Sequence, residues 1–478
     1  MAISEFEITD AGDSGISGMN LANVKLTNNQ ITQAQNRGII LEEVDGTVEI
    51  ANNKITNTVG VLPATPTTAN PPTGQGIGLF DVTGTVEITD NQITGTTGFR
   101  GNFDLTNPDN NYLATGQGIA LINTTAGEVN LTISGNQLEN NGIDTTDPNA
   151  DTRGDGIGIF LEGEAIVNSL DINNNTISNN GGNGVIIEQG LLTLFSSGGT
   201  DGGNSQINNA TISDNTIENN TQQGIFVRSF GGTGNLAIEN NPSISDNGSN
   251  GIRILANGNA QMTANINNNT NISNNNSFGI EITANENTQI TTEIVNNSIS
   301  QNRFSGIGIF ANGDAQITAE KITNNSISQN GAEGIEISAG GNGQITTQIT
   351  NNTDISDNGS NGISIFAGGD GQIATEISNN TNISNNNERG INIFTNPDNG
   401  QIDANVQSNV LTNNGFNGAA LGGRLCINLN DNESDTDYQL TNVPMFGGTL
   451  QVVDLMNIDN NNIGTVTTMD AIDVPSCP

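Results

Sequence analysis

The sequence predicts an all-β fold, a parallel β-helix solenoid with three short strands per turn and a small C-terminal β cap. Three observations lead to this prediction. A Gly-Ile pair recurs along the chain, isoleucines alternate with other residues after each pair, and Asn-rich segments separate the alternating runs. Repeat periods of 20–50 residues are typical of stacked architectures, and alternation of β-branched residues at period two indicates strands rather than helices.

The Gly-Ile pair marks the first strand of each turn. From Gly224 onward the copies follow one another every 27 or 28 residues. In the clearest copy we expect strands at residues 306–310, at residues 316–319 and around Ile327. The anchor glycines are Gly15, Gly38, Gly76, Gly118, Gly156, Gly184, Gly224, Gly251, Gly279, Gly306, Gly334, Gly362 and Gly390, with a degenerate copy at Gly418.

Asparagines mark the corners between strands. In consecutive copies one asparagine lies three residues after the isoleucine of the third strand. Asparagine tolerates left-handed backbone conformations, and asparagines stacked at one rung position can form an amide ladder. We therefore interpret these residues as structural. They are Asn220, Asn247, Asn275, Asn302, Asn330, Asn358 and Asn386.

The chain is strongly acidic and its two cysteines lie near the end. Fifty acidic residues oppose 11 basic ones, and the resulting net charge of −39 repels nucleic acid and anionic lipid. No stretch reaches the ~20 apolar residues of a membrane-spanning helix, and no signal peptide is visible. Cys426 and Cys477 suggest a disulfide in an oxidising compartment; two unrelated thiols are the alternative. We expect a β-helix over residues 1–418 and a β cap over residues 419–478.

The Gly-Ile-x-Ile and Asn-Asn-x-Ile-Ser-x-Asn units run from about Gly15 to Gly418. On these units the chain resembles the right-handed parallel β-helix proteins of the pectate-lyase-like superfamily, and the resemblance implies the right-handed winding. That superfamily includes lyases, hydrolases, epimerases, phage tailspikes and adhesin passengers, so the fold alone does not specify an activity. The final segment looks like the tail of some secreted bacterial β-helix proteins.

Function is expected where the repeat rhythm breaks. Three insertions precede consecutive anchors and would stack at one corner into a lateral wall; tolerated surface loops are the alternative. Aromatic and basic side chains in this wall are candidates for contacting a polysaccharide or a cell-surface glycan. The insertions lie near residues 58–75, 95–117 and 141–155, and a fourth lies near residues 190–206. The candidate ligand-binding residues are Phe99, Arg100, Phe103, Tyr112 and Arg153.

A polysaccharide lyase at the same loops would need cationic groups for a carboxylate and a base for the proton. Arg100 and Arg153 could serve as the cations. Asp104 and Asp155 could complete such a site. The chain has no histidine, which disfavours an enzyme. No cofactor is required, although loop oxygens could hold calcium. The candidate metal ligands are Asp144, Asp147, Asp151 and Asp155.

Two patterns recur on the first strands. Glu281 and Glu336 share an outward position two turns apart, with Gly308 between them, which approaches the carboxyl spacing of an inverting hydrolase. Phenylalanine also recurs four residues after several anchors, where strict alternation would point it outward onto sugar rings. We favour packing at the edge of the core, because a corner follows. These residues are Phe80, Phe160, Phe310, Phe366 and Phe394.

These observations favour an extracellular or surface-displayed bacterial protein with a structural or adhesive role, contacting carbohydrate or another surface through its stacked loops. A polysaccharide lyase or hydrolase acting at the loop groove is the first alternative. A subunit of an end-to-end filament, joined through exposed strand edges, is the second.

Overall fold

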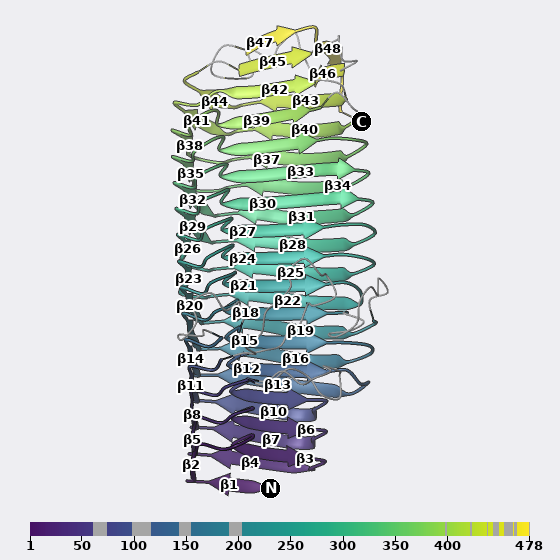
Figure 1. The fold of residues 1–478 in the computed structure, drawn as a ribbon. Coiled ribbons are helices and arrows are strands. Elements are labelled where there is room, and N and C mark those ends of the chain that lie inside the picture. Colours follow the sequence, from purple (N-terminus) through teal and green to yellow (C-terminus); the bar gives the residue numbers. More distant parts are fainter. Residues whose placement is uncertain are drawn as a thin grey trace. The chain divides into compact units, whose positions relative to one another are not determined.

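The computed structural model describes residues 1–60, 74–97, 116–142, 154–190, 203–396, 399–420, 423–436, 438–442, 449–453, 462 and 466–477. In these ranges all of the assigned secondary structure is β-strand, and every strand pairing is parallel (Figure 1). None of these ranges contains a helix with the length and apolarity needed to cross a bilayer. The chain divides into two compact units: unit 1 is Met1–Ser249 with Asn257–Met262, and unit 2 is Asn250–Ala256 with Thr263–Pro478.

Unit 1 is a β-helix in which each turn contributes one strand to each of three sheets, here called A, B and C. Sheet A of this unit contains β1 (Ala2–Ser4), β4 (Asn23–Thr27), β7 (Asp45–Ala51), β10 (Thr83–Thr89), β13 (Glu128–Ser134), β16 (Ile166–Asn173), β19 (Gln206–Ser213) and β22 (Thr233–Glu239). Sheet B contains β2 (Glu7–Thr9), β5 (Gln30–Thr32), β8 (Lys54–Thr56), β11 (Gln92–Thr94), β14 (Gln137–Glu139), β17 (Thr176–Ser178), β20 (Thr216–Glu218) and β23 (Ser243–Ser245). Sheet C contains β3 (Ile16–Met19), β6 (Ile39–Glu42), β9 (Ile77–Phe80), β12 (Ile119–Asn123), β15 (Ile157–Leu161), β18 (Val185–Gln189) and β21 (Ile225–Ser229).

Unit 2 repeats the same three-sheet arrangement. Its sheet A contains β28 (Gln289–Val295), β31 (Gln316–Thr323), β34 (Gln344–Thr350), β37 (Gln372–Ser378), β40 (Gln401–Gln407), β43 (Arg424–Asn430), β46 (Thr449–Val453) and β48 (Ile472–Val474), and β25 (Gln261–Asn267) spans the boundary between the units. Sheet B contains β26 (Ile272–Ser273), β29 (Ser298–Ser300), β32 (Ser326–Ser328), β35 (Asp354–Ser356), β38 (Ile383–Ser384), β41 (Val410–Thr412) and β44 (Glu433–Ser434). Sheet C contains β24 (Ile252–Ala256), β27 (Ile280–Ala284), β30 (Ile307–Gly313), β33 (Ile335–Gly341), β36 (Ile363–Ala367), β39 (Ile391–Thr395), β42 (Phe416–Ala420), β45 (Tyr438–Asn442) and β47 (Val466–Met469).

The predicted inward columns of isoleucine form the core of each unit. In unit 2, Ile307 and Ile309 pair in register with Ile335 and Ile337 of the next turn, and all four are fully buried. Successive turns lie ~4.8 Å apart because they are hydrogen-bonded parallel strands. Like side chains therefore stack on like, and each buried isoleucine contributes about 1.5–3 kcal/mol.

The predicted amide ladder is present, and a second one lies at the corner between sheets A and B. In the first ladder, Nδ2 of Asn330 donates to Oδ1 of Asn358 at 3.0 Å. In the second, Asn325 donates to Asn352 in the same way at 3.1 Å. The left-handed conformation belongs to the residue before each ladder asparagine, such as Gln329 (φ 57°), so the ladder asparagines serve through hydrogen bonding rather than backbone shape.

The C-terminal segment also pairs in parallel with the turns before it. Strand β43 pairs with β40, and β46 pairs with β43. Cys426 on β43 is bonded to Cys477, with Cα atoms 5.7 Å apart. The disulfide therefore fastens the residues after β48 to sheet A of unit 2, while the boundary predicted at residue 418 stays a prediction.

Candidate functional site

Most residues predicted for the loop wall lie outside the described part of the chain. This applies to candidates from the second and third insertions, while Asp155 and both cysteines are described. The residues outside it are Phe99, Arg100, Phe103, Asp104, Tyr112, Asp144, Asp147, Asp151 and Arg153. The glycan, lyase and calcium roles assigned to them therefore stay predictions.

Among the described residues, the candidate functional site lies on the outer face of sheet C. This is the face opposite the isoleucine core. Three positions of each turn lie there: the residue before the anchor glycine, and the second and fourth residues after it. Gly158 illustrates this geometry, because a Cβ atom there would lie 2.5 Å from the ring of Phe160 and 3.4 Å from Cγ of Gln117. The three positions therefore form neighbouring columns along the strands.

In unit 1 this outer face carries a second apolar layer. Ile122, Phe160 and Ile186 are between 1 and 5 % exposed although they point away from the core. Arg37 lies at one end of the layer, with its guanidinium 4.8 Å from the ring centroid of Phe80, and burial lowers the pKa of Arg37 to about 10. The expectation that Phe80 and Phe160 pack at the core edge is wrong: both are buried, but in the outer layer.

Two carboxyl groups are buried within this outer layer. Asp155, 5 % exposed, accepts hydrogen bonds through Oδ1 from the backbone and side chain of Asn183 at 2.7 and 2.8 Å. Glu188, 1 % exposed, forms an ion pair with Arg228 of the next turn. Burial raises the pKa of Asp155 to about 6, against the effect of its amide donors. Burial also raises the pKa of Glu188 to about 7; Arg228 lowers it and Asp155 raises it further.

In unit 2 the same face carries a group of three aromatic rings: Phe278 precedes β27, Phe304 precedes β30 and Phe310 lies on β30. The ring of Phe278 lies 5.9 Å from that of Phe304 and 5.8 Å, edge-on, from that of Phe310. Gly308 makes this contact possible, because a Cβ atom there would lie 2.7 Å from Phe310 and 2.9 Å from Phe278. Phe304 is 47 % exposed, whereas Phe278 and Phe310 are half-buried.

Glu281 and Glu336 flank these rings. Both pair in register with Gly308, from the turns on either side. The predicted column is therefore present, with the two glutamates two turns, ~9.6 Å, apart. Glu281 accepts from Nδ2 of Asn250 at 2.6 Å and pairs with Arg253 at 3.3 Å. Burial, followed by the charges of Glu333 and Glu281, raises the pKa of Glu336, which accepts from Ser305 at 2.9 Å.

A second aromatic pair lies further along sheet C of unit 2. Phe366 on β36 and Phe394 on β39 have ring centroids 4.9 Å apart. They and Phe310 are half-buried, whereas Ile309, Ile365 and Ile393 beside them are fully buried. The expectation of core-edge packing is wrong here too, because the strands continue past the phenylalanine and keep the alternation that points it outward.

We call Phe278, Phe304, Phe310, Glu281 and Glu336 the aromatic–carboxylate strip.

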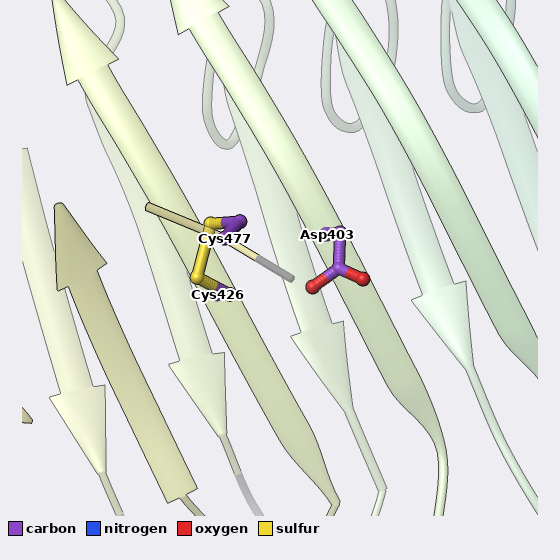
Figure 2. Close-up of side chains that lie close together, drawn as sticks. All are labelled: Asp403, Cys426 and Cys477. Atoms are coloured by element: carbon purple, nitrogen blue, oxygen red, sulfur yellow. A yellow bond between two sulfur atoms is a disulfide. The ribbon is translucent and has the colours of Figure 1, made fainter. Parts of the chain in front are cut away.

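Asp403 lies beside the disulfide on sheet A of unit 2 (Figure 2). Within the described ranges it forms with Cys426 and Cys477 the one group of at least three Cys, Asp or Glu residues whose ligand atoms lie within 4.8 Å of one another. Thiolates, not disulfide sulfurs, bind metals, and Asp403 is paired with Arg424 through two hydrogen bonds. With its sulfurs joined, this group does not provide the ligands of a metal centre.

The residues that carry this site were partly foreseen. The Glu281 and Glu336 column was read from the repeat, but Glu188 and Arg228 were not. Their signal is positional: both occupy the fourth place after an anchor, where earlier turns carry Phe80, Ile122 and Phe160. Glu42 also stands in this column, in register with Phe80, so what distinguishes Glu188 and Arg228 is that they are opposite charges in adjacent turns.

One family comparison gives a match. The family described as right handed beta helix region matches residues 1–195 and 158–322. Neither the comparison with curated proteins nor the comparison with solved structures found a significant match.

Proposed function

Because the chain belongs to the right-handed β-helix family, which specifies a scaffold rather than an activity, we propose a function from its surface. The protein is a structural or adhesive β-helix of the cell exterior that binds carbohydrate along the outer face of sheet C. The aromatic–carboxylate strip is the observation that carries this proposal. The disulfide between Cys426 and Cys477 supports an oxidising location, which fractionation of the native host would test.

The strip has the chemistry that a sugar chain needs. Aromatic rings such as Phe304 and Phe310 offer apolar faces to the C–H groups of a pyranose ring. Carboxylates such as Glu281 accept hydrogen bonds from sugar hydroxyls. Gly308 lets the rings of Phe278 and Phe310 pack against the strand, so the rings and the glutamates on either side lie along one line across the strands.

Binding can be tested with soluble polysaccharides in affinity gel electrophoresis. We expect retardation by at least one of xylan, alginate or polygalacturonate. Phe304→Ala and Phe310→Ala should each weaken it roughly two- to tenfold, because an aromatic contact contributes about 0.5–1.5 kcal/mol. Phe6→Ala is the matched control, since Phe6 is also exposed, at 58 %, but lies in unit 1. Equal weakening by all three variants, or none by the strip variants, would exclude the strip as the binding surface.

A second candidate is an inverting glycoside hydrolase on the same strip. The environments of its two glutamates differ: Glu281 is paired with Arg253, whereas burial raises the pKa of Glu336. Such a difference suits a general base and a general acid. Glu336 would protonate the glycosidic oxygen as that bond breaks, while Glu281 takes a proton from the water that attacks the anomeric carbon.

Reducing-sugar release from the polysaccharide that binds would test the hydrolase. Glu336→Gln should abolish release but preserve binding, because it removes the transferable proton and keeps the shape. Unchanged release would exclude Glu336 as the acid. The lyase alternative at Arg100 and Arg153 has its own readout, an unsaturated uronate product lost in Arg100→Ala, and a filament would be visible by electron microscopy.

A further inference from the structure

Two buried carboxyl groups of unit 1, those of Asp155 and Glu188, have no part in the proposed carbohydrate binding. Asp155 precedes β15, and Glu188 lies on β18 in the next turn. Both belong to the outer face of sheet C, where Phe160 pairs directly with Glu188 and Gly158 pairs with Ile186. The two acids are therefore embedded in an apolar layer rather than in a solvated surface.

Charge is not balanced within the group of Asp155, Glu188 and Arg228 when both acids are ionised. Glu188 forms an ion pair with Arg228 on β21. The negative charge of Asp155, just before β15, raises the pKa of Glu188. Asp155 is held by amides, Asn183 through Oδ1 and Gln117 through Oδ2 at 3.4 Å. Among the described residues of this group, the one cation, Arg228, pairs with Glu188, whereas Asp155 has amide partners. A buried charge without a partner costs several kcal/mol, and such a group normally takes up a proton instead.

A second observation concerns the unused hydrogen-bonding capacity of Glu188. Its Oε2 atom is buried and has no hydrogen-bond partner among the described residues. An ionised carboxylate that lacks a donor on a buried oxygen keeps a poorly compensated charge, whereas a protonated carboxyl is neutral. The surroundings of Glu188 therefore suit the protonated form better than the charged form.

We propose that Asp155, Glu188 and Arg228 form a pH-sensitive latch on the outer apolar layer of unit 1. With one proton held by the two carboxyls, the group of Asp155, Glu188 and Arg228 carries no net charge and the layer stays closed. Loss of that proton leaves one uncompensated negative charge beside Phe160 and Ile186, and the layer loosens. The latch is independent of the aromatic–carboxylate strip, which belongs to unit 2.

The direction of the pH effect follows from the raised pKa values. Asp155 and Glu188 bind protons more tightly in the folded protein than their ordinary values of 3.8 and 4.5 allow. Their contribution to stability is therefore complete below about pH 4 and is lost as pH rises through 6 and 7. The latch is closed in mild acid and released at weakly alkaline pH.

Hydrogen–deuterium exchange of the full chain, read on peptides covering residues 154–190, tests the latch. After correction for intrinsic exchange, wild-type protection should fall roughly tenfold or more between about pH 5 and about pH 8.5, since one pKa unit is a tenfold change. Glu188→Gln and Asp155→Asn each remove one ionisable carboxyl and should retain protection at the higher pH. Glu87→Gln, an exposed change on sheet A of the same unit, should behave as wild type.

Each outcome is decisive. A pH-dependent wild type with protected Glu188→Gln or Asp155→Asn supports the latch, and two variants guard against one failing to fold. A wild type whose protection does not change with pH overturns it. So does an equal fall in wild type and both variants, because general repulsion within the acidic chain would then be the cause.

Discussion

The asparagine ladder makes a quantitative prediction for Asn330→Ala. Oδ1 of Asn330 accepts from the backbone N–H and the Nδ2 group of Asn302 at 3.1 and 3.0 Å. Its Nδ2 donates to Asn358 at 3.0 Å. Alanine leaves both donors of Asn302 without this acceptor in a fully buried corner. Each orphaned buried donor costs about 1–3 kcal/mol, so the expected loss is about 4 kcal/mol.

That loss is a large share of the ~5–15 kcal/mol by which domains are stable. Urea unfolding followed by far-ultraviolet circular dichroism measures it. Asn312→Ala is the control, because the Asn312 side chain is exposed and makes its amide contact with Asn285 at the surface; we expect a change within about 0.5 kcal/mol. If the unfolding free energy of Asn330→Ala lay within about 1 kcal/mol of that of Asn312→Ala, the ladder would not stabilise the fold as argued.

Three further changes test other parts of the structure. Gly308→Val should displace the rings of Phe278 and Phe310, costing about 1–3 kcal/mol in the same unfolding assay and reducing polysaccharide retardation; a variant with wild-type stability and binding would show that the glycine is not needed. Cys477→Ser removes a crosslink between residues 51 apart and should lower the unfolding free energy by roughly 2–4 kcal/mol, whereas no difference under oxidising conditions would mean that the bond does not form. Glu336→Gln should raise the melting temperature relative to wild type more at alkaline than at acidic pH, because a raised folded pKa makes ionisation destabilising; the opposite trend would contradict the assignment.

The repeat made the architecture predictable. The Gly-Ile anchors and the period-two isoleucines report directly on hydrogen-bonded, half-buried strands, and each turn restates them. The sequence predicted the wrong direction for Phe310 because it predicted too short a strand. Strand β30 continues to Gly313, so no corner rotates the ring toward the core.

The outer layer of unit 1 could not be derived in the same way. Alternation places Phe160 and Glu188 on the face away from the core, and alternation by itself predicts a half-buried strand whose outer positions are solvated. Their burial at 1 % each is a property of the folded chain and leaves no periodic signal. The strip of unit 2 was more accessible to prediction, because Glu281, Gly308 and Glu336 stand at one repeat position.

The register of sheet A has a consequence for how such a chain can grow. Strand β31 holds an extra residue, Glu320, where pairing skips from Thr292–Ala319 to Glu293–Lys321, and the partners on either side resume their register. A single-residue insertion can thus be absorbed locally, without shifting the amide ladders. Gene duplication of a whole turn would preserve every ladder contact as well. Lengthening by entire turns is therefore nearly neutral for folding, and turn number is a quantity that evolution can adjust to set the reach of the protein.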